Sequence, residues 1–153
     1  HAVHTARYAT LALSLLCALP IAQAGLLGFG SGKQQETLLP AEQAFMLHAP
    51  LWDGAELIVG WDIAPGYYLY RDRIAVDAVQ PEGYELGFAS MPLGEAHVDA
   101  HFGETAIFRD QVRIRFRPKS GQPPQQIRVK YQGCAEDKVC YPSQTSVLNV
   151  DAR

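Results

Sequence analysis

Cysteine is scarce in this sequence, and so are clusters of positive charge and long apolar runs. The 153 residues include three cysteines, and 13 Lys and Arg stand against 16 Asp and Glu, for a net charge of −3. A surface that binds nucleic acid needs clustered Lys and Arg, so this balance argues against that class of partner. After residue 24 the sequence shows no helical pattern of ten or more residues and no internal repeat. The length is typical of a single domain.

Residues 1–24 have the organisation of a secretory signal peptide. Arg7 provides a positive start, residues 9–19 form an apolar run too short for a membrane-spanning helix, and residues 22–24 (Ala-Gln-Ala) match a cleavage site. We therefore predict a signal peptide that is removed after Ala24. A retained N-terminal anchor is the alternative, and the short apolar run argues against it.

Cleavage after Ala24 leaves a mature chain with two predicted parts. Residues 25–37 are rich in glycine and polar side chains and predict a flexible N-terminal segment, followed by one domain over residues 38–153. Cys17 leaves with the signal peptide, so Cys134 and Cys140 can form one intramolecular pair. Export also brings the chain into an oxidising compartment, where a disulfide persists.

Alternating hydrophobicity predicts an all-β domain. Residues 55–63 and 126–131 alternate apolar and polar side chains, and residues 106–116 do so with an irregularity near Asp110. Residues 91–103 lack a clean period and predict a long loop. Further short strands are expected over residues 45–49, 67–70, 74–79, 84–88 and 145–150. Seven or eight short strands favour an immunoglobulin-like β-sandwich, with a closed barrel as the main alternative.

The cysteine pair allows two interpretations. On composition alone, a single pair in an exported domain is more often a structural bond. However, closing a loop of about seven residues stabilises the fold by only about 2.4 kcal/mol on the chain-entropy estimate. Glu136, Asp137 and Lys138 should keep the segment near solvent, and the two carboxylates should disfavour a thiolate, so we expect thiols that need a partner's reactive cysteine.

Zinc binding is a further alternative for this pair. Cys134 and Cys140 together with His97 and His101 offer suitable ligand types. Five residues between two cysteines is an unusual spacing for a zinc site, so we expect no metal and no other cofactor.

Three motifs give the chain a family resemblance. Residues 61–70 (WDIAPGYYLY), 102–110 (FGETAIFRD) and 131–142 (YQGCAEDKVCYP) closely resemble the N-terminal periplasmic domain of the DsbD family of thiol:disulfide interchange transporters of Gram-negative bacteria. The resemblance extends from about Leu39 to Val150. It implies an immunoglobulin-like domain that acts as a protein-disulfide reductase in the periplasm.

The resemblance also implies partners. The domain would take electrons from the thioredoxin-like C-terminal domain of the same family protein, which is fed through a membrane domain outside these 153 residues. It would pass them to periplasmic disulfide isomerases and cytochrome c maturation thioredoxins. The sulfurs carry the electrons, so no cofactor is required.

Residue roles follow from the same resemblance. Cys140 matches the cysteine that forms mixed disulfides, and Cys134 matches the resolving cysteine. Tyr68 and Tyr70 match aromatic residues that line the site, and strand alternation places these two on one face. Asp99 matches an acidic residue of a loop that caps the disulfide.

The cap is where the sequence departs from the family. The position of the family's capping phenylalanine is held by His101, and Phe102 is its neighbour, so either side chain is a candidate cover for the disulfide.

The remaining functional alternatives are a non-enzymatic β-sandwich binding module with a structural disulfide and, more weakly, a periplasmic metal carrier.

Overall fold

The computed structural model describes residues 37–151, which fold into short antiparallel strands. The helical elements in this part are α1 (Ala41–Ala44) and the 3₁₀ turn η1 (Arg71–Arg73). The predicted absence of a helix of ten or more residues is therefore confirmed for the described part. The predicted signal peptide and nearly all of the predicted N-terminal segment lie outside the described residues. No helix within residues 37–151 has the length and apolar character needed to cross a membrane.

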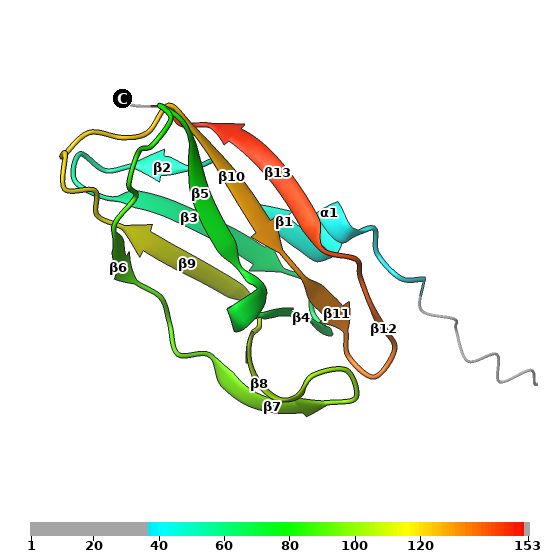
Figure 1. Cartoon of the computed structure of the whole chain (residues 1–153). Coiled ribbons are helices and arrows are strands. Elements are labelled where there is room, and N and C mark those ends of the chain that lie inside the picture. Colours follow the sequence, from blue (N-terminus) through cyan, green and yellow to red (C-terminus); the bar gives the residue numbers. More distant parts are fainter. Residues whose placement is uncertain (1–36, 152–153) are drawn as a thin grey trace, which may run out of the picture. The chain divides into compact units, whose positions relative to one another are not determined.

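Three sheets make up the domain (Figure 1). The first has the order β1-β3-β9-β6, with β2 also paired to β3. Its strands are β1 (Phe45–Leu47), β2 (Leu51–Trp52), β3 (Leu57–Ile63), β6 (Phe88–Ser90) and β9 (Gln111–Phe116). The second has the order β13-β10-β5, with β5 (Ala75–Gln80), β10 (Gln126–Tyr131) and β13 (Gln144–Asn149). The third has the order β12-β11-β4-β8-β7. It contains β4 (Tyr67–Tyr70), β7 (Glu95–Asp99), β8 (Gly103–Phe108), β11 (Gly133–Ala135) and β12 (Val139–Cys140).

The first two sheets face each other and form the immunoglobulin-like β-sandwich that the sequence predicts. In β3 the buried side chains alternate with more exposed ones, and β10 buries Ile127 and Val129 between exposed basic residues. Trp61 from β3 and Tyr131 from β10 meet edge to face, with ring centroids 5.6 Å apart. Burying such apolar faces between two sheets is the main stabilising contribution to a fold of this type.

The third sheet continues the sandwich at one end. Short connections join it to the sandwich: β3 leads into β4 through a turn at residues 64–66, β10 leads into β11 through Gln132, and β8 leads out into β9 through residues 109–110. At the last of these, Asp110 has a φ of 64° and interrupts the strand. The predicted irregularity near Asp110 is therefore confirmed.

Two sequence predictions were wrong. Residues 91–103 are not a long loop, because β7 pairs with β8 from Glu95↔Ile107 to Asp99↔Gly103. This edge strand is held by its backbone while most of its side chains face solvent, so it has no hydrophobic period for the sequence to reveal. Residues 84–88 do not form a strand either, since β6 begins at Phe88 after Gly87 adopts a φ of 64°.

Gly133 determines how closely β11 approaches its neighbours. A Cβ at this position would lie 2.3 Å from the backbone oxygen of Tyr68 and 2.6 Å from two ring carbons of Phe45. No side chain fits there without moving backbone. The glycine in front of Cys134 thus allows the strand to pack directly on β4.

We expect Gly133→Ala to destabilise the domain by about 3 kcal/mol, the upper part of the range for overpacking a filled interior. Urea unfolding followed by tryptophan fluorescence measures the change. Gly60→Ala in β3 is the matched control, because the nearest atoms, Arg113 Cγ at 3.2 Å and the Val112 backbone oxygen at 3.3 Å, are farther away than those at Gly133, and a smaller loss is expected. Equal losses in the two variants would contradict the role of close backbone approach at Gly133.

Candidate functional site

The cysteine pair lies in a hairpin at one edge of the third sheet. Cys134 in β11 and Cys140 in β12 are direct cross-strand partners and form a disulfide. The turn between them, residues 136–138, has Asp137 at a φ of 55° and closes with a hydrogen bond from the Lys138 amide to the Ala135 oxygen (3.1 Å). Asp is one of the few residues other than glycine that tolerate this left-handed backbone conformation.

The register of β11 on β4 places the disulfide on the face that carries two tyrosines. Cys134 lies opposite Tyr68 on the neighbouring strand. Tyr68, Tyr70 and Ile107 pack with the two cysteines in a small buried cluster, whereas Tyr67 belongs to the main core. The prediction that Tyr68 and Tyr70 share one face is confirmed.

Tyr70 contacts both sulfurs. Its hydroxyl lies 3.0 Å from Cys134 Sγ and 3.5 Å from Cys140 Sγ, and it also makes a short hydrogen bond to Asp99 Oδ2. Disulfide sulfurs carry no hydrogen, so the phenol is the only possible donor in this oxidised state, and its single proton is directed at Asp99 while its oxygen lies against the sulfurs. Burial, reinforced by the hydrogen bond to Asp99, raises the pKa of Tyr70 well above its ordinary value. The hydroxyl therefore keeps its proton at neutral pH.

Asp99 is held at the end of β7 by its neighbours. Its Oδ1 accepts hydrogen bonds from the backbone amides of His101 (2.9 Å) and Phe102 (2.7 Å), while Oδ2 accepts from Tyr68 (3.4 Å) and Tyr70. Burial acts to raise the pKa of Asp99, but the hydrogen bonds outweigh it, and the pKa is lowered. Asp99 is thus an ionised acceptor that fixes both phenols.

A cavity of about 310 Å³ borders the disulfide. It is lined by β7 and the residues that follow it on one side and by the cysteine hairpin on the other. Cys134 is almost fully buried, at 1% exposure, whereas Cys140 is partly exposed. Of the two sulfur-bearing residues, Cys140 is therefore the one nearer to solvent.

The two candidate cover residues differ in what they contact. The Phe102 ring packs edge to face on Tyr70 at 4.7 Å and lies beneath the guanidinium of Arg73, 4.2 Å from the ring centroid. His101 is exposed and lines the cavity beside the disulfide. The structure thus brings all seven predicted site residues together, with Phe102 on the tyrosine and His101 at the cavity wall.

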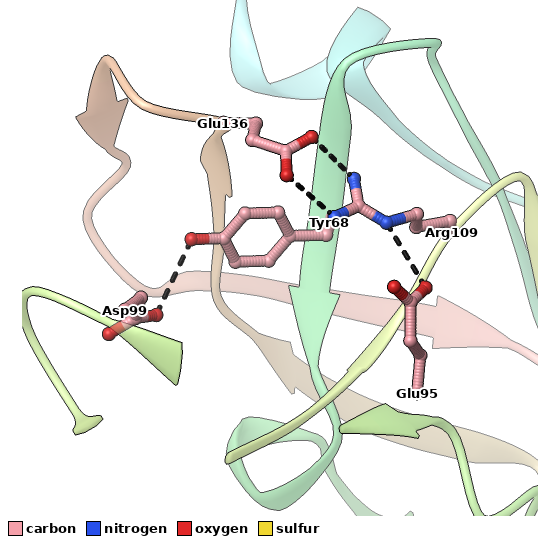
Figure 2. A network of polar contacts seen from close by, with 5 residues as sticks. All are labelled: Tyr68, Glu95, Asp99, Arg109 and Glu136. Carbon is pink, nitrogen blue, oxygen red and sulfur yellow. Dashed lines mark hydrogen bonds and ion pairs between the residues drawn. The ribbon is translucent and has the colours of Figure 1, made fainter. Parts of the chain in front are cut away.

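Two charged residues beside this site, Arg109 and Glu95, were not predicted from the sequence. Arg109 donates two hydrogen bonds of 2.8 Å to the two oxygens of Glu136 and one of 3.2 Å to Glu95 (Figure 2). The hydrogen bonds from Arg109 lower the pKa of Glu136, and the same contacts raise the pKa of Arg109. The Glu136 carboxylate beside the sulfurs is therefore balanced by the Arg109 guanidinium.

His97 was considered as a zinc ligand, but its ring packs on Tyr68 at 4.8 Å. Within residues 37–151, no three His, Cys, Asp or Glu side chains converge in an arrangement that could hold a metal ion. The sequence signal that could have revealed Arg109 was its position in the motif at residues 102–110.

Fold and site together define a class: an immunoglobulin-like β-sandwich domain with a disulfide in a terminal hairpin, beside two phenols and an aspartate. The sequence matches the family described as "Thiol:disulfide interchange protein DsbD, N-terminal" over residues 35–152. The chain belongs to this family.

Curated relatives support the assignment. A thiol:disulfide interchange protein DsbD from Yersinia pestis is 36% identical over 153 residues, which cover 95% of this chain and 25% of the relative. DsbD 2 from Pseudomonas aeruginosa is 34% identical over 119 residues, covering 78% of this chain and 19% of the relative. The chain thus spans about a quarter or less of the length of these relatives.

Solved structures show the same fold. The N-terminal domain of Neisseria meningitidis DsbD in its reduced form superposes with a TM-score of 0.63 and 26% identity, covering 75% of this chain and 90% of that one. The complex between the N-terminal domains of DsbD and PilB from the same organism gives a TM-score of 0.64 at 26% identity, covering 76% and 90%. These matches confirm the predicted family and fold.

The ionised state of Asp99 leads to a pH prediction. The pKa of Asp99 is lowered below its ordinary value of 3.8, so its stabilising effect is present above that pH and is lost as the pH falls through the folded-state value. Asp99→Asn should reduce the free energy of unfolding by about 1 kcal/mol at pH 7, since a partly exposed charged acceptor is lost. The difference from the wild type should shrink below about pH 4.

Urea unfolding of both proteins at several pH values measures this difference. Asp77→Asn in β5, outside the site, is the control for a simple change of net charge. A difference between wild type and Asp99→Asn that stays constant from pH 7 to pH 3 would rule out stabilisation by the ionised carboxylate.

Proposed function

We propose that this chain is a periplasmic protein-disulfide reductase domain that exchanges dithiol and disulfide with thioredoxin-like proteins through Cys134 and Cys140. The observation that carries the proposal is the position of the bond. It joins two short paired strands at a sheet edge, borders a cavity and has Cys140 partly exposed. Such a bond can open without separating the two layers of the sandwich.

The cysteines have different tasks in the exchange. In the reduced domain the Cys140 thiolate attacks a partner's disulfide, forming an intermolecular disulfide and releasing one partner thiolate. The Cys134 thiolate then attacks Cys140 Sγ, which re-forms the internal disulfide and releases the second partner thiolate. Two electrons pass to the partner, whose two sulfurs take up two protons. The burial of Cys134 suits an internal attack, and the exposure of Cys140 suits contact with a partner.

Tyr70 and Asp99 supply polar support for these steps. When Cys134 is a thiol, its S–H can donate to the Tyr70 oxygen while the Tyr70 hydroxyl donates to Asp99. When Cys134 becomes a thiolate, the same hydroxyl can donate to the sulfur, which stabilises the charge in a largely apolar site. Tyr68 donates a second hydrogen bond to the same Asp99 oxygen.

The family resemblance and the solved complex suggest the partners. The related Neisseria domain was captured with the N-terminal domain of PilB. We propose that electrons arrive from the thioredoxin-like C-terminal domain of a longer family protein and leave to disulfide isomerases and cytochrome c maturation thioredoxins. The direction follows the reduction potentials of the partners, where about 30 mV corresponds to about 1.4 kcal/mol for two electrons.

The division of roles predicts which variant traps a partner. In Cys134→Ser the resolving sulfur is absent, so a mixed disulfide between Cys140 and a thioredoxin-like probe domain should accumulate. Cys140→Ser should give little adduct because its remaining thiol is buried. Non-reducing electrophoresis and mass spectrometry measure both. Equal trapping by the two variants, or a wild-type disulfide that resists reduction until the domain unfolds, would favour a binding module with a structural bond.

The cover of the disulfide can be assigned with a matched pair of variants. Phe102→Ala should raise the rate of reduction by a thioredoxin-like probe several-fold, because it uncovers the Tyr70 ring, whose hydroxyl lies against the sulfurs. His101→Ala removes a side chain at the cavity wall and tests the other candidate. A reduction rate that is unchanged in His101→Ala would eliminate His101 as the cover, and one unchanged in Phe102→Ala would eliminate Phe102.

A further inference from the structure

The third sheet brings its two edges together around the disulfide. In the order β12-β11-β4-β8-β7, the cysteine hairpin lies at one edge and β7 at the other, with β4 and β8 between them. Nevertheless, residues from both edges line the cavity beside the disulfide. The sheet is therefore strongly curled, and side chains connect its two edges.

Two sets of contacts make this connection. At the end of β7, Asp99 accepts hydrogen bonds from Tyr68 and Tyr70 in the middle of the sheet. At the start of β7, Arg109 joins Glu95 to Glu136 in the turn of the hairpin (Figure 2). We call this second group of Glu95, Arg109 and Glu136 the Arg109 clasp.

The geometry of the clasp requires an arginine. Its two terminal nitrogens meet the two oxygens of one carboxylate, and its Nε reaches a second carboxylate on another strand. A lysine ammonium is a point charge and cannot form this planar fork while also reaching the second strand. The Arg109 side chain is 26% exposed and also lies over the Tyr68 ring, 5.5 Å from its centroid, so packing restricts it further.

The clasp acts on the cysteine hairpin at the edge of the third sheet. β12 has two residues and pairs with β11 alone, so the hairpin turn is a protruding element of the sheet. Glu136 lies in that turn, two residues after Cys134, and its amide donates to the Gly66 oxygen (2.9 Å). Releasing its carboxylate from Arg109 would allow the turn to move away from β7 and widen the cavity.

We propose that Arg109 is a positioning residue for the exchange reaction: by tying the cysteine hairpin to β7 it limits how fast a thiol reaches the Cys134–Cys140 bond. This inference rests on the proposed function for its biological meaning, but its physical content is the accessibility of the bond in the folded domain. The clasp keeps the cavity narrow until a partner displaces the hairpin or β7.

The test is reduction of the folded, oxidised chain by excess dithiothreitol without denaturant. Dithiothreitol loses two electrons to form its cyclic disulfide, while the Cys134–Cys140 bond is cleaved to two thiols. Quenching with an alkylating agent and mass spectrometry give the rate. Arg109→Gln and Glu136→Gln should each react about tenfold faster, the effect expected when a hydrogen-bonded charge pair is lost. Their double variant should react no faster than Arg109→Gln, because the Arg109–Glu136 pair is already lost in that variant.

Two further variants sharpen the result. Arg109→Lys should react nearly as fast as Arg109→Gln, since a lysine keeps the charge but not the fork. Arg117→Gln is the matched control, because it removes an arginine from an ion pair with Glu56 (3.4 Å) beside the first sheet, and it should react at the wild-type rate. Urea unfolding of each variant shows whether the reaction occurs in the folded state.

The proposal is overturned if Arg109→Gln reacts at the wild-type rate, if Arg109→Lys behaves like the wild type, or if the effects of Arg109→Gln and Glu136→Gln multiply in the double variant. Should Arg109→Gln not fold, Glu136→Gln alone decides the question. Failure of the proposed function is a separate outcome. It would appear as a wild-type domain that does not exchange with a thioredoxin-like probe, whatever the dithiothreitol rates are.

Discussion

The antiparallel register of β11 on β4 is the constraint on which the site depends. It pairs Cys134 with Tyr68 and so directs the sulfur to the face that carries both tyrosines. Because side chains alternate along a strand, a slip of one residue would turn the cysteine into the main core. Gly133 allows β11 to approach β4 closely in this register, since only a residue without a side chain fits between Tyr68 and Phe45. The chemistry of the hairpin is therefore determined by backbone packing.

Charge is balanced around the disulfide by residues from distant parts of the chain. Asp99 remains ionised because phenols and backbone amides donate to it, and Glu136 remains ionised because Arg109 does. As a result, neither carboxylate faces the sulfurs as an uncompensated charge. The same contacts connect the two edges of the curled sheet, so electrostatic balance and the shape of the cavity have a common origin.

Much of the fold could be predicted because apolar periodicity reports burial. The alternation in β3 and β10 marked the two faces of the sandwich, and Asp110 marked a real break. β7 was not predicted, because most side chains of this edge strand are exposed and its sequence shows no periodic hydrophobicity. The seven candidate site residues were found through motifs and strand alternation. Arg109, Glu95 and His97 were not assigned their contacts, because their partners lie on other strands.

The sequence by itself determined the class of fold and the shared face of Tyr68 and Tyr70, since these depend on local pattern and composition. With Cys17 assigned to the predicted signal peptide, it also pointed to the pairing of Cys134 with Cys140. The tertiary structure alone decided that Cys134 is buried and Cys140 partly exposed, that Phe102 packs on Tyr70, and that Arg109 bridges Glu136 and Glu95. The reason is physical: those features depend on how the third sheet curls, and the curl brings together strands that are distant in both sequence and sheet order.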